Sequence, residues 1–192
     1  MQISSKFGVS ALTCCALFFT GCQQYVKTPD QPSPKEVAAN QFNLQGKIGV
    51  RTPQQSGSAF FTWVQDRNEY DIELSGILGV GKTQISGKPG QVQLNSAKTG
   101  LIEAATPEEL LELATGWQAP ITHLVDWVQA RPATTQAKIQ RDTAQRPQQI
   151  IEDGWTVDLS YNETATVPNK LILKQALESG RENRITMVIQ NR

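Results

Sequence analysis

The chain has little of the chemistry that metal sites, disulfide frameworks and nucleophilic catalysis require. Its 192 residues include one histidine, His123, and three cysteines, which all lie near the N-terminus at Cys14, Cys15 and Cys22. Cleavage before Cys22 would leave a single thiol, which excludes a disulfide within the mature chain. The patterns H-E-x-x-H, C-x-x-C and G-x-S-x-G do not occur, and a lone histidine in a helical pattern is more often structural. We therefore expect no enzymatic activity, no metal and no cofactor.

An excess of charge of one sign is also missing. The chain has 18 basic and 18 acidic residues, and its formal net charge is zero. We therefore expect no nucleic-acid partner, because such partners attract strongly basic chains. The length and the 39% content of hydrophobic residues suffice for one ordinary core.

The N-terminal segment has the organisation of an export signal. Lys6 is the only charged side chain up to residue 21, and a largely apolar run over residues 7–19 follows it. That run is too short to cross a membrane as a mature helix. The last residues, Phe19-Thr20-Gly21-Cys22, resemble the lipobox of bacterial lipoproteins, in which the cysteine is acylated and the leader is removed. A plain cleaved signal with a free Cys22 is the alternative.

The residues after Cys22 favour a lipid-anchored domain at the outer membrane. Gln23 stands where an aspartate would resemble a signal for retention in the inner membrane. A polar segment broken by Pro29, Pro32 and Pro34 follows, which is typical of a tether. We therefore predict a signal peptide over residues 1–21, a lipid-anchored tether over 22–41 and a domain over 42–192.

Most of the domain has the alternating apolar pattern of half-buried strands. Apolar residues fall at even positions from Phe42 to Val50, and Gly46 among them is expected to allow a bend. Residues 58–66 are apolar on both faces, which predicts one face on a core and the other against a lid or ligand. Alternation and turn signals predict further strands at residues 70–74, 83–85, 92–94, 100–104, 155–161, 171–175 and 184–190.

Two short amphipathic helices interrupt the strands. Thr106-Pro107-Glu108-Glu109 forms a capping box at the start of the first helix, and Gly116 is placed to end it. After Pro120, apolar residues again recur at helical spacing. Residues 133–149 are polar and predict no element. Together these patterns predict an antiparallel sheet with a helical insertion, in an α+β or barrel-like single domain.

One glycine-rich stretch matches the phosphate-binding P-loop pattern by its letters alone. It reads Gly76-Ile77-Leu78-Gly79-Val80-Gly81-Lys82-Thr83. A P-loop needs a helix that begins at its lysine and threonine, because the loop N–H groups and the helix N-terminus hold the phosphates together. Gly87, Pro89 and Gly90 come soon after and disfavour such a helix. The preceding strand also alternates, whereas a P-loop strand is continuously apolar. The stretch therefore predicts a hairpin loop.

The tip of this predicted hairpin is apolar. Ile77, Leu78 and Val80 stand between glycines, at a place where hairpins are normally polar. Either the tip folds back on the core, or it protrudes as an apolar knob that suits insertion into a membrane. The residues alone leave both possibilities open.

The order and spacing of several short segments resemble the LolB family of outer-membrane lipoprotein receptors. The likeness covers residues 42–190, and no single segment is specific by itself. The segments are Phe61-Thr62-Trp63-Val64-Gln65, Tyr70-Asp71-Ile72-Glu73-Leu74, Leu78-Gly79, Gly87-Lys88-Pro89-Gly90-Gln91-Val92-Gln93-Leu94, Ala105-Thr106-Pro107-Glu108-Glu109-Leu110-Leu111, Gly116-Trp117-Gln118-Ala119-Pro120-Ile121, Trp127-Val128 and Gly154-Trp155-Thr156-Val157.

This resemblance implies a mainly β, α+β fold: a single-domain, unclosed antiparallel β-barrel with a short helical insertion that caps an apolar cavity. The implied function is to accept lipoproteins from a periplasmic carrier similar to LolA, to shelter their acyl chains in the cavity and to insert them into the outer membrane. We expect a monomer at the periplasmic face of that membrane, with acyl chains, the carrier and outer-membrane lipid as its partners.

The resemblance also implies roles for particular residues. Lipidation is expected at Cys22, and a membrane-insertion loop at Gly76, Ile77, Leu78 and Gly79, with Leu78 as its apolar residue. Tryptophan more often fills a core than lines a site, but we expect five aromatic residues to line the cavity: Trp63, Tyr70, Trp117, Trp127 and Trp155.

Two interpretations from other classes remain at this point. The first is a lipid-anchored structural subunit of an envelope assembly, which would have the same tether and strands but no cavity. The second is a P-loop nucleotide-binding enzyme that uses residues 76–83. An enclosed apolar cavity would distinguish the receptor from both.

Overall fold

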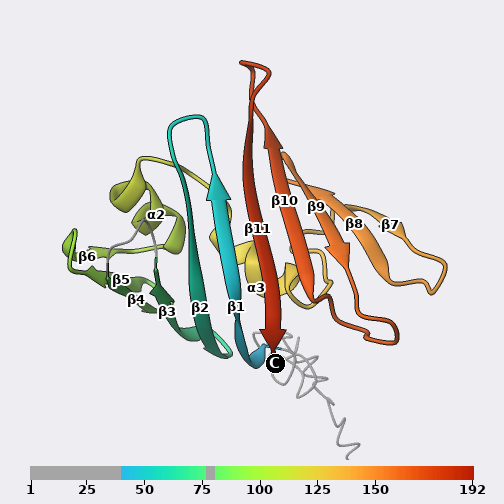
Figure 1. Cartoon of the computed structure of the whole chain (residues 1–192), viewed down its shortest axis with the longest axis horizontal. Helices are drawn as coiled ribbons and strands as arrows, with labels where there is room; N and C mark the ends of the chain where they lie inside the picture. The colour runs from blue at the N-terminus through green and yellow to red at the C-terminus, as the bar shows by residue number, and fades with distance from the viewer. Residues whose placement is uncertain (1–39, 77–80) are drawn as a thin grey trace, which may run out of the picture. The chain divides into compact units, whose positions relative to one another are not determined.

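A computed structural model describes residues 40–76 and 81–192. Its main feature is an antiparallel sheet of eleven strands (Figure 1). The first six are β1 (Gln41–Arg51), β2 (Ser56–Asp66), β3 (Glu69–Ser75), β4 (Lys82–Lys88), β5 (Gln91–Ser96) and β6 (Gly100–Ala104). Three helices come next, namely α2 (Pro107–Thr115), the 3-10 helix η2 (Ile121–His123) and α3 (Leu124–Trp127). The last five strands are β7 (Lys138–Arg141), β8 (Pro147–Glu152), β9 (Trp155–Ser160), β10 (Lys170–Ala176) and β11 (Glu182–Asn191).

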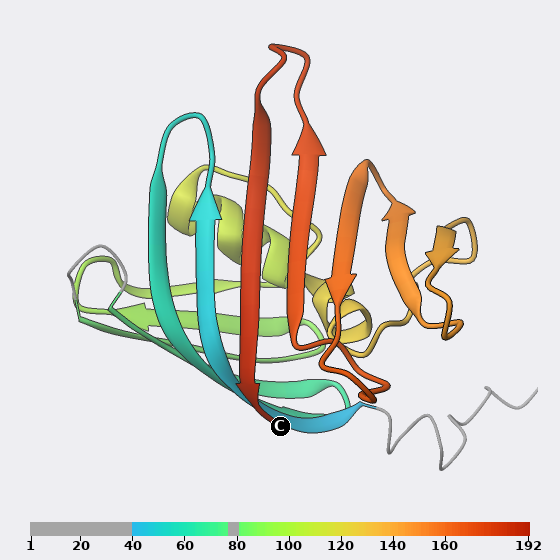
Figure 2. The same cartoon turned by 45° about the vertical axis from the view of Figure 1, so that its right-hand side comes forward.

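The sheet is not closed into a barrel. The strand order is β6-β5-β4-β3-β2-β1-β11-β10-β9-β8-β7, so β6 and β7 form its two edges. The chain passes from one edge to the other through α2, η2 and α3. Strands β3 to β6 run across the direction of β1, β2 and β11, and the helices lie on the concave side (Figure 2). The prediction of an unclosed antiparallel barrel with a short helical insertion is confirmed.

Gly46 lies where the predicted bend falls. The register of β1 against β11 shifts between Gln45 and Gly46, which marks a bulge. A Cβ at Gly46 would lie 2.0 Å from the carbonyl oxygen of Val188 and 3.0 Å from the Phe61 ring. Only glycine therefore fits between the backbone of β11 and the Phe61 ring of β2. Its lack of a side chain allows β1 to bend at this position.

The core lies between the concave face of the sheet and the helices. Alternate residues of the central strands point into it, as the period-2 pattern predicts. Its members include Leu44, Phe61, Trp63, Leu124, Trp127, Ile150, Trp155, Val157, Leu159, Leu171, Leu173, Ile185, Met187 and Ile189. The opposite face of the same strands carries polar side chains and a few exposed apolar ones.

The first helix begins and ends as the sequence predicts. Thr106 Oγ1 accepts a hydrogen bond from the N–H of Glu109, and the Glu109 carboxylate accepts one from the N–H of Ala105. Gly116 ends α2 in the left-handed conformation, with φ of 68°, and its N–H donates to the carbonyl of Glu112. The second predicted helix is one 3-10 turn followed by one α-helical turn.

One part of the predicted pattern is wrong. Residues 133–149 predict no element, yet the structure places β7 and the start of β8 in this segment. Ile139 of β7 is opposite Ile150 of β8, and the other β7 residues, Lys138, Gln140 and Arg141, are polar. A single apolar side chain in a short edge strand gives no alternation to detect. The hairpin that Asp153 and Gly154 predict is confirmed between β8 and β9, and both have positive φ.

The residues after Gly81 exclude the P-loop interpretation. Lys82 and Thr83 begin strand β4, where they pair with Ser75 and Leu74 of β3. The Lys82 ammonium lies 2.6 Å from the Glu73 carboxylate rather than in a phosphate cradle. A helix N-terminus is therefore missing where a P-loop requires one, within the described part of this segment.

Candidate functional site

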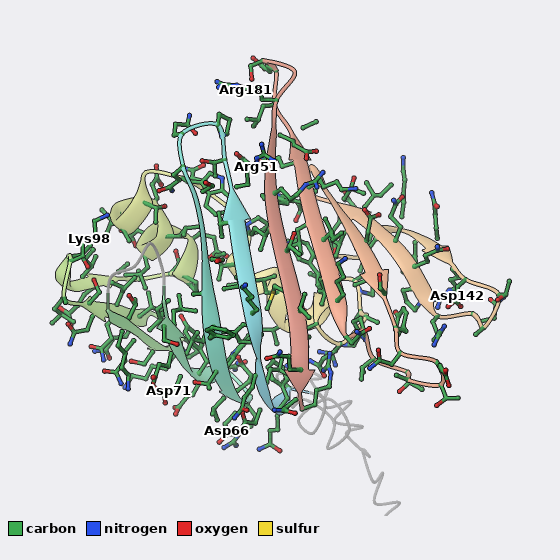
Figure 3. The ribbon with its side chains drawn as sticks, in the orientation of Figure 1. Arg51, Asp66, Asp71, Lys98, Asp142 and Arg181 are labelled. Atoms are coloured by element: carbon green, nitrogen blue, oxygen red, sulfur yellow. The ribbon has the colours of Figure 1, made fainter. Side chains whose placement is uncertain are left out.

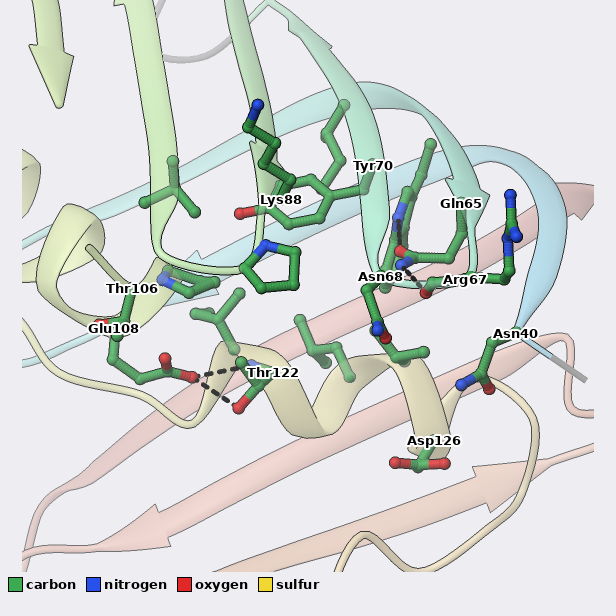
Figure 4. A pocket seen from close by; sticks show the side chains of 18 of the residues that line it. Asn40, Gln65, Arg67, Asn68, Tyr70, Lys88, Thr106, Glu108, Thr122 and Asp126 are labelled. Carbon is green, nitrogen blue, oxygen red and sulfur yellow. Dashed lines mark hydrogen bonds between the residues drawn. The ribbon is translucent and has the colours of Figure 1, made fainter. Parts of the chain in front are cut away.

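An apolar cavity lies between the curved sheet and the helices. Its volume is about 460 Å³, within the range of about 300–1,000 Å³ that is usual for ligand pockets. The strands supply one wall and the helical segment supplies the other (Figure 4). The apolar lining residues are Ile48, Phe61, Trp63, Ile72, Leu74, Pro89, Val92, Ala105, Pro107, Ile121, Leu124, Val125 and Met187, with Tyr70 among them.

Alternation in β2 and β3 directs side chains to the cavity. Phe61 and Trp63 are buried on the concave face of β2, and Ile72 and Leu74 line the cavity from β3. The outward-facing residues between them contact solvent, so no lid from the described residues covers the second apolar face predicted for β2. Its exposed Phe60 is instead 57% accessible.

The polar atoms of Trp63 are satisfied inside the apolar wall. Its indole Nε1 donates a hydrogen bond of 2.9 Å to Oε1 of Gln65, and Gln65 Nε2 donates one of 2.8 Å to the carbonyl of Arg67. Phe42 packs edge-on against the Trp63 ring, with ring centroids 5.1 Å apart. These contacts fix the orientation of Trp63 without placing an unpaired donor in the cavity wall.

Tyr70 has a buried hydroxyl without a partner among the described residues. Burial raises the pKa of Tyr70 to about 12, and the Glu108 carboxylate adds to this effect. The ring lies over Gly87, where a Cβ would approach the phenol oxygen to 2.5 Å. Gly87 therefore leaves the space that the Tyr70 ring occupies in the wall.

Glu108 connects the two helical segments above the cavity. Its Oε1 accepts hydrogen bonds of 2.8 Å from both the backbone N–H and the hydroxyl of Thr122 (Figure 4). The start of α2 is thus tied to η2, and Ile121 and Val125 are held against the cavity.

The polar residues at the edge of the cavity are separated by sign. Arg67 lies in the turn between β2 and β3 and Lys88 ends β4 on the strand wall, whereas Glu108 and Asp126 lie on the helical wall. Asp126 is held by the guanidinium of Arg131 at 2.7 Å. The cavity therefore combines an apolar interior with an opening that carries charge.

The five aromatic residues that the sequence analysis proposes occupy two environments. Trp63 and Tyr70 line the cavity. Trp127 and Trp155 are buried in the core beside it, and Trp117 packs half-buried against Trp155, with ring centroids 6.3 Å apart. Aliphatic residues such as Ile72 and Val92 make up more of the lining, and the alternation of β3 and β5 is the signal that could have identified them.

The other proposed sites lie largely outside this region. Cys22 and the loop residues Ile77, Leu78 and Gly79 are outside the described residues, while Gly76 follows β3 and is exposed with φ of 81°. His123 lies 3.6 Å from Asp153 and packs edge-on against Trp127. The described residues contain no group of histidine, cysteine and acidic side chains that could hold a metal ion. None of the helices described is long and apolar enough to cross a membrane.

Comparison with known proteins gives a consistent result. A family described as outer membrane lipoprotein LolB matches residues 40–191. The outer-membrane lipoprotein LolB of Stutzerimonas stutzeri strain A1501 is 35% identical over 192 positions, which cover 93% of this chain and 91% of that protein. The protein of the same name from Pseudomonas putida strain W619 is 40% identical over 154 positions, which cover 78% of this chain and 73% of that protein.

Proposed function

Because the chain belongs to the LolB family of outer-membrane lipoproteins, we propose that its cavity shelters the acyl chains of lipoproteins in transit. As a member of this family the chain is an outer-membrane lipoprotein that acts as a receptor in lipoprotein localisation. The structural-subunit and nucleotide-binding interpretations are not favoured.

The apolar cavity is the observation that carries the proposal. Each methylene that moves from water into an apolar environment contributes about 0.8 kcal/mol, so exposing the acyl chains of a lipoprotein would cost on the order of tens of kcal/mol. A wall of aliphatic and aromatic side chains removes that cost during transit. The sheet is open, so its edges are not joined to each other. The strand wall and the helical wall of the cavity can therefore move apart around a ligand without breaking strand pairs.

The cargo comes from a soluble periplasmic carrier similar to LolA and leaves into the outer membrane. No catalytic step and no nucleotide are needed if the receptor holds acyl chains more tightly than the carrier does and the membrane holds them more tightly still. The receptor works as a monomer anchored through acylated Cys22. The loop with Gly76, Ile77, Leu78 and Gly79 contacts the membrane during deposition, and Leu78 is its apolar contact.

A dye-displacement experiment tests the cavity. An apolar fluorescent dye should bind the wild-type chain and be released by a fatty acid or a synthetic triacylated lipopeptide. Val125 is half-buried on the cavity wall, so Val125→Trp should fill part of the space and weaken dye binding by about tenfold. Leu113→Trp is the control, because Leu113 lies exposed on α2 away from the cavity.

Two outcomes would contradict the proposal. Equal dye binding by wild type and Val125→Trp, with an unchanged unfolding midpoint, would show that the dye binds elsewhere. If a triacylated lipopeptide fails to displace the dye, the cavity binds apolar molecules but not lipoprotein acyl chains. The structural-subunit interpretation would then have to be considered again.

A further inference from the structure

The outer face of the central sheet has an arrangement of charges that the cavity does not explain. We define this outer face as the side of β2, β1, β11 and β10 that points away from α2, η2 and α3. Arg51 of β1 lies directly opposite Arg184 of β11, and Arg184 lies directly opposite Lys174 of β10. Like charges at directly opposed positions repel each other and weaken a sheet. A row of three cations across three strands therefore needs an anionic partner.

Internal partners neutralise part of this row. Glu182 contacts the Arg184 guanidinium at 2.6 Å, and Asp158 accepts a hydrogen bond of 2.7 Å from the Lys174 ammonium. Arg51 takes part in none of the ion pairs formed by the described residues. The row thus keeps a net positive charge, and Arg51 is the residue through which an external anion would complete it.

A groove lies beside these two arginines on the outer face. Its volume is about 390 Å³, and its lining residues are Gly49, Val50, Arg51, Ser56, Gly57, Ser58, Arg184 and Thr186. Gly49 has no side chain to fill it, and the hydroxyls of Ser56, Ser58 and Thr186 line the space. Guanidinium and hydroxyl donors around an open groove suit a phosphate group, since arginine binds phosphate oxygens in a bidentate manner.

Exposed apolar side chains and lysines alternate further along the same face. Phe60 of β2 and Val188 of β11 both lie opposite Lys47 of β1, and Val188 also lies opposite Lys170 of β10. Phe60 and Val188 are 57% and 37% exposed, and the Lys47 ammonium lies 5.8 Å from the Phe60 ring centroid. Apolar side chains flanked by lysines are typical of surfaces that settle at the headgroup level of a membrane.

Glu182 and Asp158 are paired with cations of the row, and two further acidic side chains lie toward the other end of this surface. Asp66 and Asp71 lie near the turn between β2 and β3, whereas Arg51 and Arg181 lie toward the opposite ends of the long strands (Figure 3). Asp66 and Asp71 are therefore separate from the cationic row, which can approach an anionic surface without bringing these two carboxylates close to it.

We propose that the outer face is a docking surface for anionic phospholipid, with a headgroup phosphate in the groove between Arg51 and Arg184. The proposal needs only the membrane location of the chain and does not depend on acyl binding in the cavity. Phe60 and Val188 enter the headgroup region, and Lys47 and Lys170 contact neighbouring phosphates. The concave side with the cavity then points away from the bilayer, toward an arriving carrier.

Site-specific quenching on vesicles tests this surface with the full lipidated chain. The residues after Cys22 include no cysteine, so an introduced cysteine can be labelled selectively. A fluorophore at Thr62→Cys reports the outer face, and one at Thr143→Cys in the exposed turn after β7 is the reference. Vesicles contain phosphatidylethanolamine and nitroxide-labelled phosphatidylcholine, with or without phosphatidylglycerol at about one lipid in five, which supplies the negative surface potential. We expect quenching at position 62 to exceed that at 143 and to rise with phosphatidylglycerol.

Charge variants provide the matched comparison. Each cation near an anionic surface contributes about a fivefold preference for docking, so Lys47→Gln with Arg51→Gln should reduce the ratio of docked to free orientation by about 25-fold. Lys98→Gln with Lys138→Gln removes the same charge from exposed positions outside the outer face and should leave quenching unchanged. High salt should reproduce the first variant pair.

Three results would overturn the proposal. The first is equal quenching at positions 62 and 143. The second is quenching at position 62 that does not change with the phosphatidylglycerol content, and the third is an equal loss of quenching in the two variant pairs. Protection of position 62 by the carrier but not by vesicles would assign the surface to a protein partner instead. The quenching experiment does not depend on ligand binding in the cavity. Absence of quenching at position 62 would therefore leave the proposed receptor function intact.

Discussion

The indole Nε1 of Trp127 donates a hydrogen bond to Oε1 of Glu152, which joins helix α3 to strand β8 across 25 residues of sequence. The same carboxylate accepts hydrogen bonds from the N–H groups of Ala133 and Thr134, at 3.0 and 2.7 Å. Glu152 is 5% exposed. Burial alone would raise its pKa, but the hydrogen bonds from Trp127 and the two backbone N–H groups outweigh burial and hold the pKa below its usual value.

Glu152→Gln should destabilise the fold in a pH-dependent way. Hydrogen bonds to charged groups contribute about 1.5–3 kcal/mol, so we expect the free energy of unfolding at neutral pH to fall by about 2 kcal/mol. The lowered pKa means that the carboxylate stabilises the fold above its unfolded pKa near 4.5. This contribution is lost as pH falls through the folded-state pKa. Urea unfolding at pH 7 and at about pH 3 should therefore show a difference that shrinks on acidification.

The control for this experiment is Glu178→Gln, which changes an exposed carboxylate in the turn before β11. It should leave the unfolding midpoint unchanged at both pH values. A difference between wild type and Glu152→Gln that stayed constant down to acid pH would contradict a stabilising charge and leave only lost packing.

Gly46→Ala should distort the bend in β1. Its Cβ would lie 2.0 Å from the backbone oxygen of Val188, and a backbone atom can move away only if the β1–β11 pairing shifts. We expect a loss of about 3 kcal/mol, at the upper end of the cost of overpacking. Gly49→Ala is the matched control on the same strand, because its Cβ would meet nothing nearer than the Gly57 oxygen at 3.9 Å. Equal unfolding midpoints for the two variants would refute the steric argument.

Tyr70→Phe should stabilise the receptor without emptying its cavity. The Tyr70 hydroxyl is buried without a partner among the described residues, and a buried unsatisfied polar group costs about 1–3 kcal/mol. We expect the unfolding midpoint to rise at neutral pH. Because burial raises the pKa of Tyr70 to about 12, the folded state resists ionisation, and wild-type stability is lost as pH rises from about 10 toward that value. Urea unfolding from pH 7 to about pH 11 should show a widening advantage for Tyr70→Phe.

Local patterns in the sequence predict most of the fold for identifiable reasons. Alternation places Leu44, Trp63 and Leu159 on the concave face, and the capping box locates the start of α2 at Thr106. The pattern fails at β7, where Ile139 is the single apolar residue of an otherwise polar edge strand. Edge strands keep polar side chains because one side of their backbone has no partner strand.

The cavity was less predictable than the strands because a tryptophan does not reveal what it packs against. Trp127 and Trp155 lie in the core next to the cavity, although their positions in helix and strand patterns match those of lining residues. Which side of a shared wall each one occupies depends on where α3 rests on the sheet. That placement is fixed by long-range contacts such as Trp127 with Glu152, and no local pattern encodes them.

Leu78→Glu addresses deposition, the step that the cavity alone does not perform. Leu78 lies outside the described residues, in the connection between β3 and β4, whose flanking positions Gly76 and Gly81 have φ of 81° and 56°. A glutamate there would resist entry into the apolar part of a membrane, where an unpaired charge is costly. We expect the variant to bind the apolar dye and to accept cargo from the carrier as wild type does, but to leave that cargo uninserted. Transfer of a labelled lipoprotein from the carrier to outer-membrane vesicles measures acceptance and insertion separately, and Leu78→Ile is the control. Normal insertion of the lipoprotein by Leu78→Glu would contradict the role proposed for Leu78.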